Sequence, residues 1–184
     1  MKDILIAAKN LEIGGIEKSL ITLINYFVEN GYNVTLVLEE KKGTLLKQLN
    51  PTVKVVEFKP CSITFSPLRK AINFVKQAKF KLRYKNKFDF SISYATYSKP
   101  NSFVARVASK NSILWCHADY LALYNGDKTK VKSFFEDINY DEFSKIVFVS
   151  KKGKETFKQI FSEQKNVYYC NNFIDCNKIY ELSK

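Results

Sequence analysis

Short apolar runs alternate along the chain with longer segments in which apolar residues recur every three or four positions. The chain opens with an apolar run at residues 4–8, followed by a loop and an amphipathic segment from Ile16 to Asn30-Gly31. The run is long enough for one buried strand, and the later spacing is that of a helix with one buried face. The first thirty residues therefore predict a strand, a turn at Gly14-Gly15 and a helix.

The same alternation continues to the end of the chain. Six further strands are expected at residues 33–38, 53–58, 88–94, 111–116, 145–149 and 167–170. Helices are expected at residues 43–50, 68–87, 102–109, 129–140, 151–161 and from about 176, and a loop at residues 121–127. Such alternation favours a mostly parallel sheet with both faces covered. Residues 1–184 are therefore expected to form one Rossmann-like, three-layer α/β domain with about seven strands.

The composition agrees with one globular domain. Hydrophobic residues make up 46% of the 184 and aromatic residues 15%, which excludes a disordered chain. No apolar run reaches the roughly 18 residues that a membrane span needs, and the apolar start is too short for a signal peptide. The four cysteines lie far apart without a C-x-x-C pair, which fits reduced thiols in the cytoplasm better than disulfides or a zinc site.

A net charge of +12 favours an anionic partner, such as nucleic acid, anionic lipid or a phosphorylated substrate. The charge is most concentrated in residues 68–87, which contain no acidic residue. The cations of this segment include Arg69, Lys70, Lys76, Lys79, Lys81 and Arg83. Apolar residues at roughly helical spacing accompany them, which is typical of a basic amphipathic helix on a membrane surface. The alternative is a crossover helix that packs one face on the sheet and leaves its lysines in water.

Candidate functional residues follow the predicted strands at their carboxyl ends, where open α/β sheets bind ligands. Gly14-Gly15 would let the backbone approach a ligand, and the following helix start favours an anion. The alternative is a turn that needs glycine for its own dihedral angles. His117, the single histidine, directly follows the strand at 111–116, and a structural role is its alternative. Ser150 follows the strand at 145–149 and is also placed to cap the next helix.

In this order and spacing, these residues resemble the N-terminal half of a GT-B-fold retaining glycosyltransferase of family 4, also called group 1. The resemblance covers residues 2–179. Its motifs are Gly14-Gly15-Ile16-Glu17, the strand residues 113–117 and 147–150, and the turn at 171–175. It implies transfer of a sugar from a nucleotide-sugar donor to an acceptor hydroxyl, with retention of configuration, in bacterial surface polysaccharide or glycolipid synthesis.

The resemblance also implies roles for individual residues. Gly14 and Gly15 would approach the donor diphosphate or the transferred sugar, and Ser150 would lie on the donor side. His117 would line the reaction centre, where a neutral imidazole can hydrogen-bond a sugar hydroxyl without adding charge. The acceptor side would be lined by Tyr94, Ala95 and Thr96. No cofactor or metal is implied, and the chain has no D-x-D sequence.

The resemblance extends over the N-terminal half of such enzymes alone. It implies that a C-terminal donor-binding domain lies outside residues 1–184, and that these residues by themselves have little or no transferase activity. Since many relatives act on lipid-linked acceptors, it further implies that the basic segment at 68–87 docks on an anionic membrane.

Two other function classes fit parts of the sequence. A dinucleotide-dependent oxidoreductase would use the first strand, the glycines and Glu39 at the end of the second strand, but the turn is not G-x-G-x-x-G. A nucleic-acid-binding module would explain the charge, but the aromatic residues lie mostly in apolar runs expected in the core, and no RNA-binding signature occurs. The glycosyltransferase interpretation is therefore preferred.

Overall fold

A computed structural model of the protein describes residues 1–95, 98–162, 164–174 and 180. Its strands are β1 Asp3–Ala8, β2 Asn33–Leu38, β3 Lys54–Glu57, β4 Phe90–Tyr94, β5 Ser112–Cys116, β6 Lys145–Phe148 and β7 Val167–Tyr169. Its helices are α1 Gly15–Glu29, α2 Ser66–Tyr84, α3 Lys99–Ala108, α4 Tyr120–Leu123, α5 Lys128–Asp137 and α6 Lys151–Ile160. Two 3-10 helices, η1 Thr44–Gln48 and η2 Tyr140–Glu142, complete the described elements.

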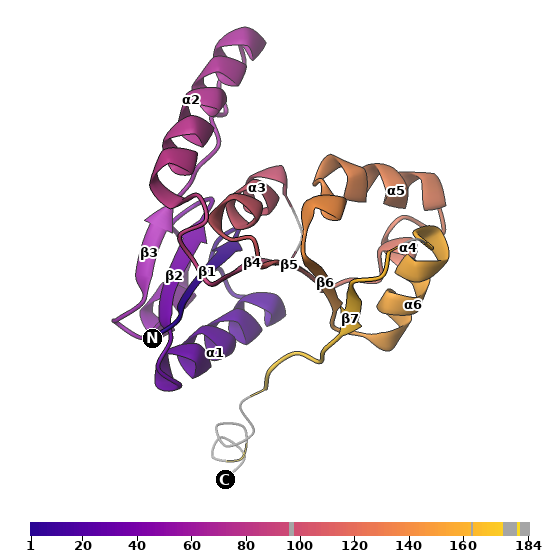
Figure 1. The fold of residues 1–184 in the computed structure, drawn as a ribbon, viewed down its shortest axis with the longest axis horizontal. Coiled ribbons are helices and arrows are strands. Elements are labelled where there is room, and N and C mark those ends of the chain that lie inside the picture. The colour runs from indigo at the N-terminus through magenta and orange to yellow at the C-terminus, as the bar shows by residue number, and fades with distance from the viewer. Residues whose placement is uncertain (96–97, 163, 175–179, 181–184) are drawn as a thin grey trace.

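The strands form one sheet in the order β3-β2-β1-β4-β5-β6-β7. Every neighbouring pair within the described residues is parallel. Helices cover both faces of the sheet (Figure 1). The predicted Rossmann-like α/β class and the seven strands are confirmed, and the sheet is wholly rather than mostly parallel.

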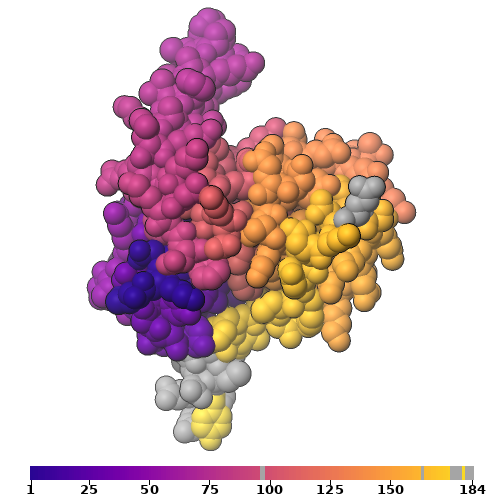
Figure 2. Space-filling view, viewed as in Figure 1, coloured from indigo at the N-terminus to yellow at the C-terminus, as the bar shows by residue number. Residues whose placement is uncertain are grey.

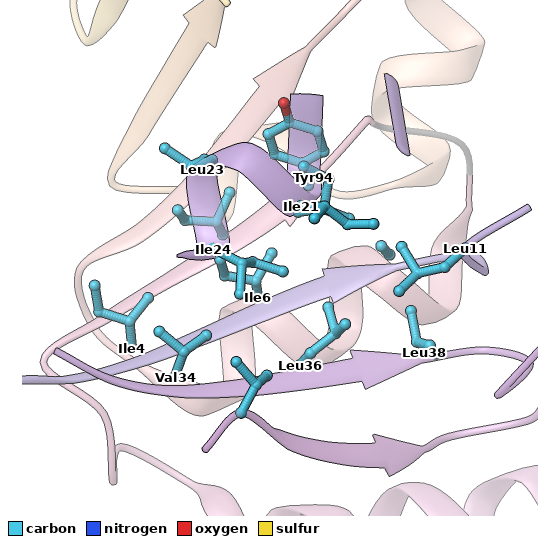
Figure 3. Close-up of a cluster of buried hydrophobic side chains, with 14 of the residues drawn as sticks. Ile4, Ile6, Leu11, Ile21, Leu23, Ile24, Val34, Leu36, Leu38 and Tyr94 are labelled. Carbon is cyan, nitrogen blue, oxygen red and sulfur yellow. The ribbon is translucent and has the colours of Figure 1, made fainter. Parts of the chain in front are cut away.

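The side chains of β1 alternate between two apolar clusters, one on each face of the sheet. Ile4 and Ile6 face α1 and form a cluster with Leu20 and Ile24 (Figure 3). On the opposite face, the neighbouring strand residues pack against α3 and the end of α2; this cluster comprises Leu5, Ala7, Val37, Phe80, Tyr84, Val104 and Ala108. Burial of β1 on both faces explains why its sequence is a continuous apolar run.

Aromatic rings form the core of the second half of the domain. Phe135 of α5 is fully buried, and its ring lies 4.9 Å from that of Phe157 of α6. Phe148 of β6 contacts the same ring of Phe157 at 5.2 Å. These aromatic residues therefore belong to the core, as the sequence predicted, and are not available to stack on nucleic-acid bases.

Several helix boundaries differ from the prediction because of capping side chains. Residues 121–127, expected as a loop, include most of α4, whose first turn is capped by Asp119, which accepts from the Ala122 N–H at 3.2 Å. Helix α3 begins before the expected Ser102, because Ser98 accepts from the Asn101 N–H and Pro100 is tolerated in a first turn. Helix α5 ends at Asp137, short of the expected residue 140. The short helix expected from about residue 176 lies almost wholly outside the described residues.

The loop after β1 is fixed by a glycine contact. The predicted helix at 43–50 is the shorter 3-10 helix η1, and Gly43 precedes it with φ +121°. A side chain on Gly43 would overlap the backbone of Leu11, so glycine is required there. The buried Leu11 donates its N–H to the Lys42 carbonyl at 2.9 Å. This contact holds the loop that leads into α1.

Helix α2 projects beyond the body of the domain (Figures 1 and 2). Its buried residues, Phe80 and Tyr84, both lie near its C-terminal end. The apolar side that the sequence predicted is mostly exposed, and its uncovered members include Leu68, Phe74, Val75 and Leu82. The alternative of a crossover helix that packs one face on the sheet is therefore correct only for the C-terminal end of α2. No helix in the described part of the chain is long and apolar enough to span a membrane.

Candidate functional site

The candidate site lies where the strand order changes direction. From β1 the chain moves outward to β2 and β3, then returns to the other side of β1 to form β4 and the remaining strands. The carboxyl ends of β1 and β4 therefore diverge into loops with a crevice between them, which is the usual ligand site of open parallel sheets. The topology thus places the loop from Lys9 to Gly14, residue Ala95 and residue His117 at one edge of the sheet.

Tyr94 connects the three elements of this edge. It ends β4, and its side chain is 2% exposed. Its hydroxyl donates to the Ser19 hydroxyl of α1 at 2.9 Å, and its ring centroid lies 4.4 Å from that of His117. Burial raises the pKa of Tyr94 to about 12, so the phenol stays protonated and serves as a hydrogen-bond donor at neutral pH.

His117 is half-buried, and its ring packs beside those of Tyr94 and Trp115. Both ring nitrogens are shielded from solvent, and neither has a hydrogen-bond partner among the described residues. Burial lowers the pKa of His117 to about 4, so the imidazole is neutral at pH 7. A neutral imidazole offers one donor and one acceptor, and buried polar atoms in folded proteins are nearly always paired. Its unused nitrogens are therefore suited to a ligand hydroxyl.

A shallow pocket opens beside Tyr94. Its volume is about 210 Å³, including space open to solvent. It is lined by Ala8, Lys9, Asn10, Ile16, Glu17, Leu20, Tyr94 and Ala95. The lining comes from the carboxyl ends of β1 and β4 and from the first turns of α1, so a ligand there would meet Tyr94 and the start of α1. Gly14, Gly15 and His117 are not among the lining residues.

The backbone dihedral angles at Gly14 and Gly15, at the start of α1, do not require glycine. Gly14 is extended, with φ −162°, a conformation open to any residue. Gly15 is the first residue of α1 and is not among the described glycines with positive φ. A side chain at Gly15 would enter open space, whereas one at Gly14 would meet the Glu17 carboxylate. The alternative that this turn needs glycine for its own dihedral angles is therefore wrong. The open space beside Gly15 is what close approach of a ligand requires.

The other predicted residues differ in what they already contact. Ser150 caps α6, since its hydroxyl oxygen accepts from the Gly153 N–H at 3.0 Å. Its hydroxyl proton is left to donate to another group. Ala95 is buried in the left-handed region at φ 55°, and its N–H donates to the Trp115 carbonyl at 3.0 Å. Thr96, the third predicted acceptor residue, lies outside the described residues.

Two contacts of the site were missed by reasoning from the sequence. Ser19, which accepts from Tyr94, carries no motif of its own. Glu39, for which the sequence offered a dinucleotide contact or a solvated loop, accepts a hydrogen bond from Ser98, the N-cap residue of α3. Burial raises the pKa of Glu39 despite that hydrogen bond. The contact ties the end of β2 to the loop after β4, and 59 residues separate its partners.

Metal ligands do not gather at this edge within the described residues. No group of three or more His, Cys, Asp or Glu side chains that could hold a metal ion occurs in that part of the chain. The arrangement combines the neutral side chains of Tyr94 and His117 with the charged Lys9 and Glu17 of the pocket lining, beside an open helix start.

The sequence matches the family model described as Glycosyltransferase Family 4 over residues 13–178. The chain belongs to this family. Membership confirms the resemblance drawn from the motifs, and it favours the glycosyltransferase interpretation over an oxidoreductase or a nucleic-acid-binding module. No curated protein sequence matches the chain.

Several solved structures share the fold of this family 4 chain. One is Anabaena Alr3699/HepE in complex with UDP and glucose, with a TM-score of 0.65 and 17% identity over 96% of this chain and 46% of that chain. Another is an alpha-glucosyltransferase in complex with UDP and a mismatched 13-mer DNA, with a TM-score of 0.59 and 16% identity over 99% of this chain and 44% of the other. WaaG, a glycosyltransferase involved in lipopolysaccharide biosynthesis, has a TM-score of 0.55 and 12% identity over 90% of this chain and 44% of WaaG. The family 4 chain thus spans less than half the length of each.

Proposed function

We propose that the chain is the N-terminal, acceptor-side half of a retaining glycosyltransferase that moves a sugar from a nucleotide-sugar donor to an acceptor hydroxyl. The observation that carries this proposal is the His117 imidazole, whose two nitrogens are shielded from solvent and have no hydrogen-bond partner among the described residues. Family membership supports the reaction class. A structure of HepE in complex with UDP-glucose supports a nucleotide sugar as donor.

His117 is the proposed catalytic residue. Its neutral ring would accept or donate a hydrogen bond at a hydroxyl of the transferred sugar, and would place no positive charge beside the cationic transition state. Gly14 and Gly15 would let the α1 backbone approach the donor diphosphate or sugar, with the helix N-terminus favouring the anion. Ser150 would donate its remaining hydroxyl proton on the donor side. The acceptor would lie against Tyr94, Ala95 and Thr96, over the pocket beside β4.

The donor site requires groups beyond those described above. A nucleotide diphosphate carries at least two negative charges, and the proposed residues here offer backbone N–H groups but no cationic pair. The chain covers 46% of HepE, which supports a second, C-terminal domain as the source of the remaining donor contacts. We therefore expect residues 1–184 alone to have little or no transferase activity. No metal or other cofactor is included in the proposal.

The acceptor is proposed to be a carbohydrate or lipid-linked sugar of a bacterial surface polysaccharide or glycolipid. WaaG, which shares the fold, is involved in lipopolysaccharide biosynthesis. The cations at Arg69, Lys70, Lys76, Lys79, Lys81 and Arg83 would face an anionic membrane from the cytoplasm. Cys61 and Cys170 are free thiols among the described residues, and the cytoplasm is the proposed compartment.

Because His117 is the single histidine, its ring Hε1 proton gives one isolated NMR signal that tests the proposal directly. We expect at least one of a panel of UDP-, GDP- and ADP-sugars to shift that signal saturably. The Gly15→Val variant should lose the shift while keeping its fold, since the added side chain enters open space. Since the remaining donor contacts are proposed to lie in a C-terminal domain, the deciding measurement uses the protein with that domain, in which the His117 signal is the one that His117→Phe removes. A folded protein of this kind whose His117 signal responds to no nucleotide sugar contradicts the proposal.

A further inference from the structure

The His117 ring is oriented by contacts with other rings and not by hydrogen bonds. Neither of its nitrogens has a hydrogen-bond partner among the described residues. Its ring centroid lies 4.4 Å from that of Tyr94 and 6.5 Å from that of Trp115. A histidine in a functional site is usually oriented by a hydrogen bond to one nitrogen, which leaves one nitrogen for the ligand. Orientation by packing leaves both nitrogens of His117 available.

The sheet fixes the backbone on which these rings stand. Tyr94 at the end of β4 and Trp115 of β5 are partners in the parallel register, and their ring centroids lie 5.7 Å apart. The Ala95 N–H donates to the Trp115 carbonyl at 3.0 Å, directly after Tyr94. The freedom that remains to the Tyr94 ring is therefore rotation of its own side chain.

Ser19 of α1 restricts that rotation. The Tyr94 hydroxyl donates to the Ser19 hydroxyl at 2.9 Å. Burial raises the pKa of Tyr94 to about 12, so the phenol keeps the proton that it donates. Because Tyr94 is 2% exposed, loss of this bond would leave a buried hydroxyl to find another partner. The bond thus holds the ring that lies nearest to His117.

Helix α1 in turn holds Ser19 in place. Leu20, the next residue of α1, belongs to the same apolar core cluster as Tyr94. Ser19 also lies four residues after Gly15, so the two residues share one side of the helix. The hydrogen bond from Tyr94 to Ser19 therefore joins the start of α1 to the ring cluster around His117.

We propose that Ser19 is a positioning residue of the site, which acts through Tyr94 to keep the His117 ring in one orientation. The inference rests on the proposed function, in which His117 meets the transferred sugar, and it adds a residue that itself touches no substrate. A hydrogen bond weakens steeply when its angle departs from linearity, so a ring free to turn would lose much of its bond to a sugar hydroxyl. Ser19 should therefore affect turnover more than substrate binding.

A purely structural role for the same hydrogen bond is the alternative. A bond that only ties α1 to β4 would lower the stability of the protein when it is removed. It would leave the His117 signal and the turnover of the folded molecules unchanged. The two roles therefore differ in measurements made on folded protein.

Removing the hydroxyl from either end of the bond tests the proposal. In the protein with the C-terminal domain, Ser19→Ala and Tyr94→Phe should both move the His117 Hε1 signal, which His117→Phe identifies by removing it. Hydrolysis of the member of the UDP-, GDP- and ADP-sugar panel that shifts this signal should have a kcat about tenfold lower and a KM within about twofold. The double variant should lose no more than either single variant, since the two changes break one bond.

Two further variants are the controls. Ser19→Thr keeps the hydroxyl, so it should retain both the position of the His117 signal and the kcat. Thr22→Ala removes a hydroxyl from the next turn of the same helix, where it donates to the Lys18 carbonyl at 3.1 Å. This variant should also leave both quantities unchanged.

Three outcomes would overturn the proposal. The first is a His117 signal that moves in neither Ser19→Ala nor Tyr94→Phe, and the second is an equal loss of kcat in Thr22→Ala. The third is a signal that moves in both variants while kcat does not fall, because turnover would then not depend on the orientation of the ring. The proposed function fails separately, if no nucleotide sugar shifts the His117 signal of the unaltered protein. The effect of Ser19 on that signal is measured without any ligand, so it is decided in either case.

Discussion

Helices α1 and α2 are the two longest helices described, and α1 turns its apolar face to the sheet whereas α2 turns most of its apolar residues to solvent. Helix α1 has 15 residues and buries Leu20, Ile21, Leu23 and Ile24 against the sheet. Helix α2 has 19 residues and buries only Phe80 and Tyr84, both near its C-terminal end. Both sequences have helical periodicity. Helical periodicity therefore identifies an apolar face but does not say whether that face meets the protein's own core or another surface.

The difference follows from charge and from length. Helix α1 carries Glu17, Lys18 and Glu29, all outside its buried face, whereas α2 carries six cations distributed around most of its circumference. A helix with so many cations cannot bury a second face without desolvating them, which is costly for unpaired charges. Helix α2 is also longer than the neighbouring strands, so its first turns have no sheet to cover. Among the described residues, the site thus leaves the two His117 ring nitrogens without a hydrogen-bond partner, while α2 leaves apolar side chains uncovered.

The largest expected effect on the free energy of unfolding distinguishes two phenylalanines of α2, one buried and one exposed. Phe80→Ala should lower the free energy of unfolding by about 3–5 kcal/mol, because Phe80 is 5% exposed and packs on Phe58 and Tyr84. Phe74→Ala should change it by no more than about 0.5 kcal/mol, since the ring is 71% exposed. Urea denaturation of both variants measures the difference. Equal losses would show that Phe74 is packed, and would contradict the projecting position of the helix.

The second effect is a pH dependence of the free energy of unfolding that arises at His117 in the site and not in α2. His117 has a folded-state pKa of about 4 against an ordinary 6.5, so the unfolded chain binds a proton that the folded chain excludes. The free energy of unfolding should therefore fall as the pH drops from about 6.5 to about 4, by about 3 kcal/mol in total. Above pH 6.5 both states are neutral and the contribution vanishes. Helix α2 has no Asp, Glu or His to titrate in this range.

A matched variant isolates the contribution of His117 from that of the carboxylates. His117→Phe keeps a ring beside Tyr94 and removes the titrating group. Urea denaturation of both proteins at a series of pH values should give curves that diverge below pH 6.5, with the variant less sensitive to acid. Parallel curves would show that the imidazole is solvated in the folded state, which would remove the observation on which the proposed function rests.

The sequence predicted the parts of this comparison that depend on local pattern. Seven strands and the positions of Gly14, Ser150 and His117 after their strands follow from the alternation of apolar runs, because parallel strands share one carboxyl edge. The exposure of the apolar side of α2 did not follow, since it depends on how far the helix overruns the sheet. Nor did the bonds from Tyr94 to Ser19 and from Ser98 to Glu39, whose partners are 75 and 59 residues apart.

The third effect on stability is smaller, and it concerns the residues that precede α6 and α2. Ser150→Ala should cost about 1 kcal/mol, because the hydroxyl caps α6 through the Gly153 N–H. Phe65→Ala should cost less than half of that, since Phe65, the N-cap residue of α2, makes no side-chain capping hydrogen bond and its ring is 64% exposed. Thermal unfolding of each variant, compared with the unaltered protein, measures both. A larger loss for Phe65→Ala would indicate that the start of α2 is packed.

The smallest effect tests whether α2 unfolds together with the domain. Glycine at an exposed position inside a helix costs about 1 kcal/mol when that helix unfolds with the rest of the protein. Lys18→Gly in α1 should show about this loss, because the adjoining residues of α1 are buried in the core. Ala71→Gly in the projecting part of α2 should lower the global unfolding free energy by less, since turns with few buried contacts open locally before the domain unfolds. Hydrogen exchange should place the effect of Ala71→Gly in the first turns of α2, with the amides near Phe80 unchanged. Equal global losses for the two variants would mean that the loop at residues 59–65 couples the projection to the core, so that α2 is held ready for its partner in the free protein rather than ordered by it.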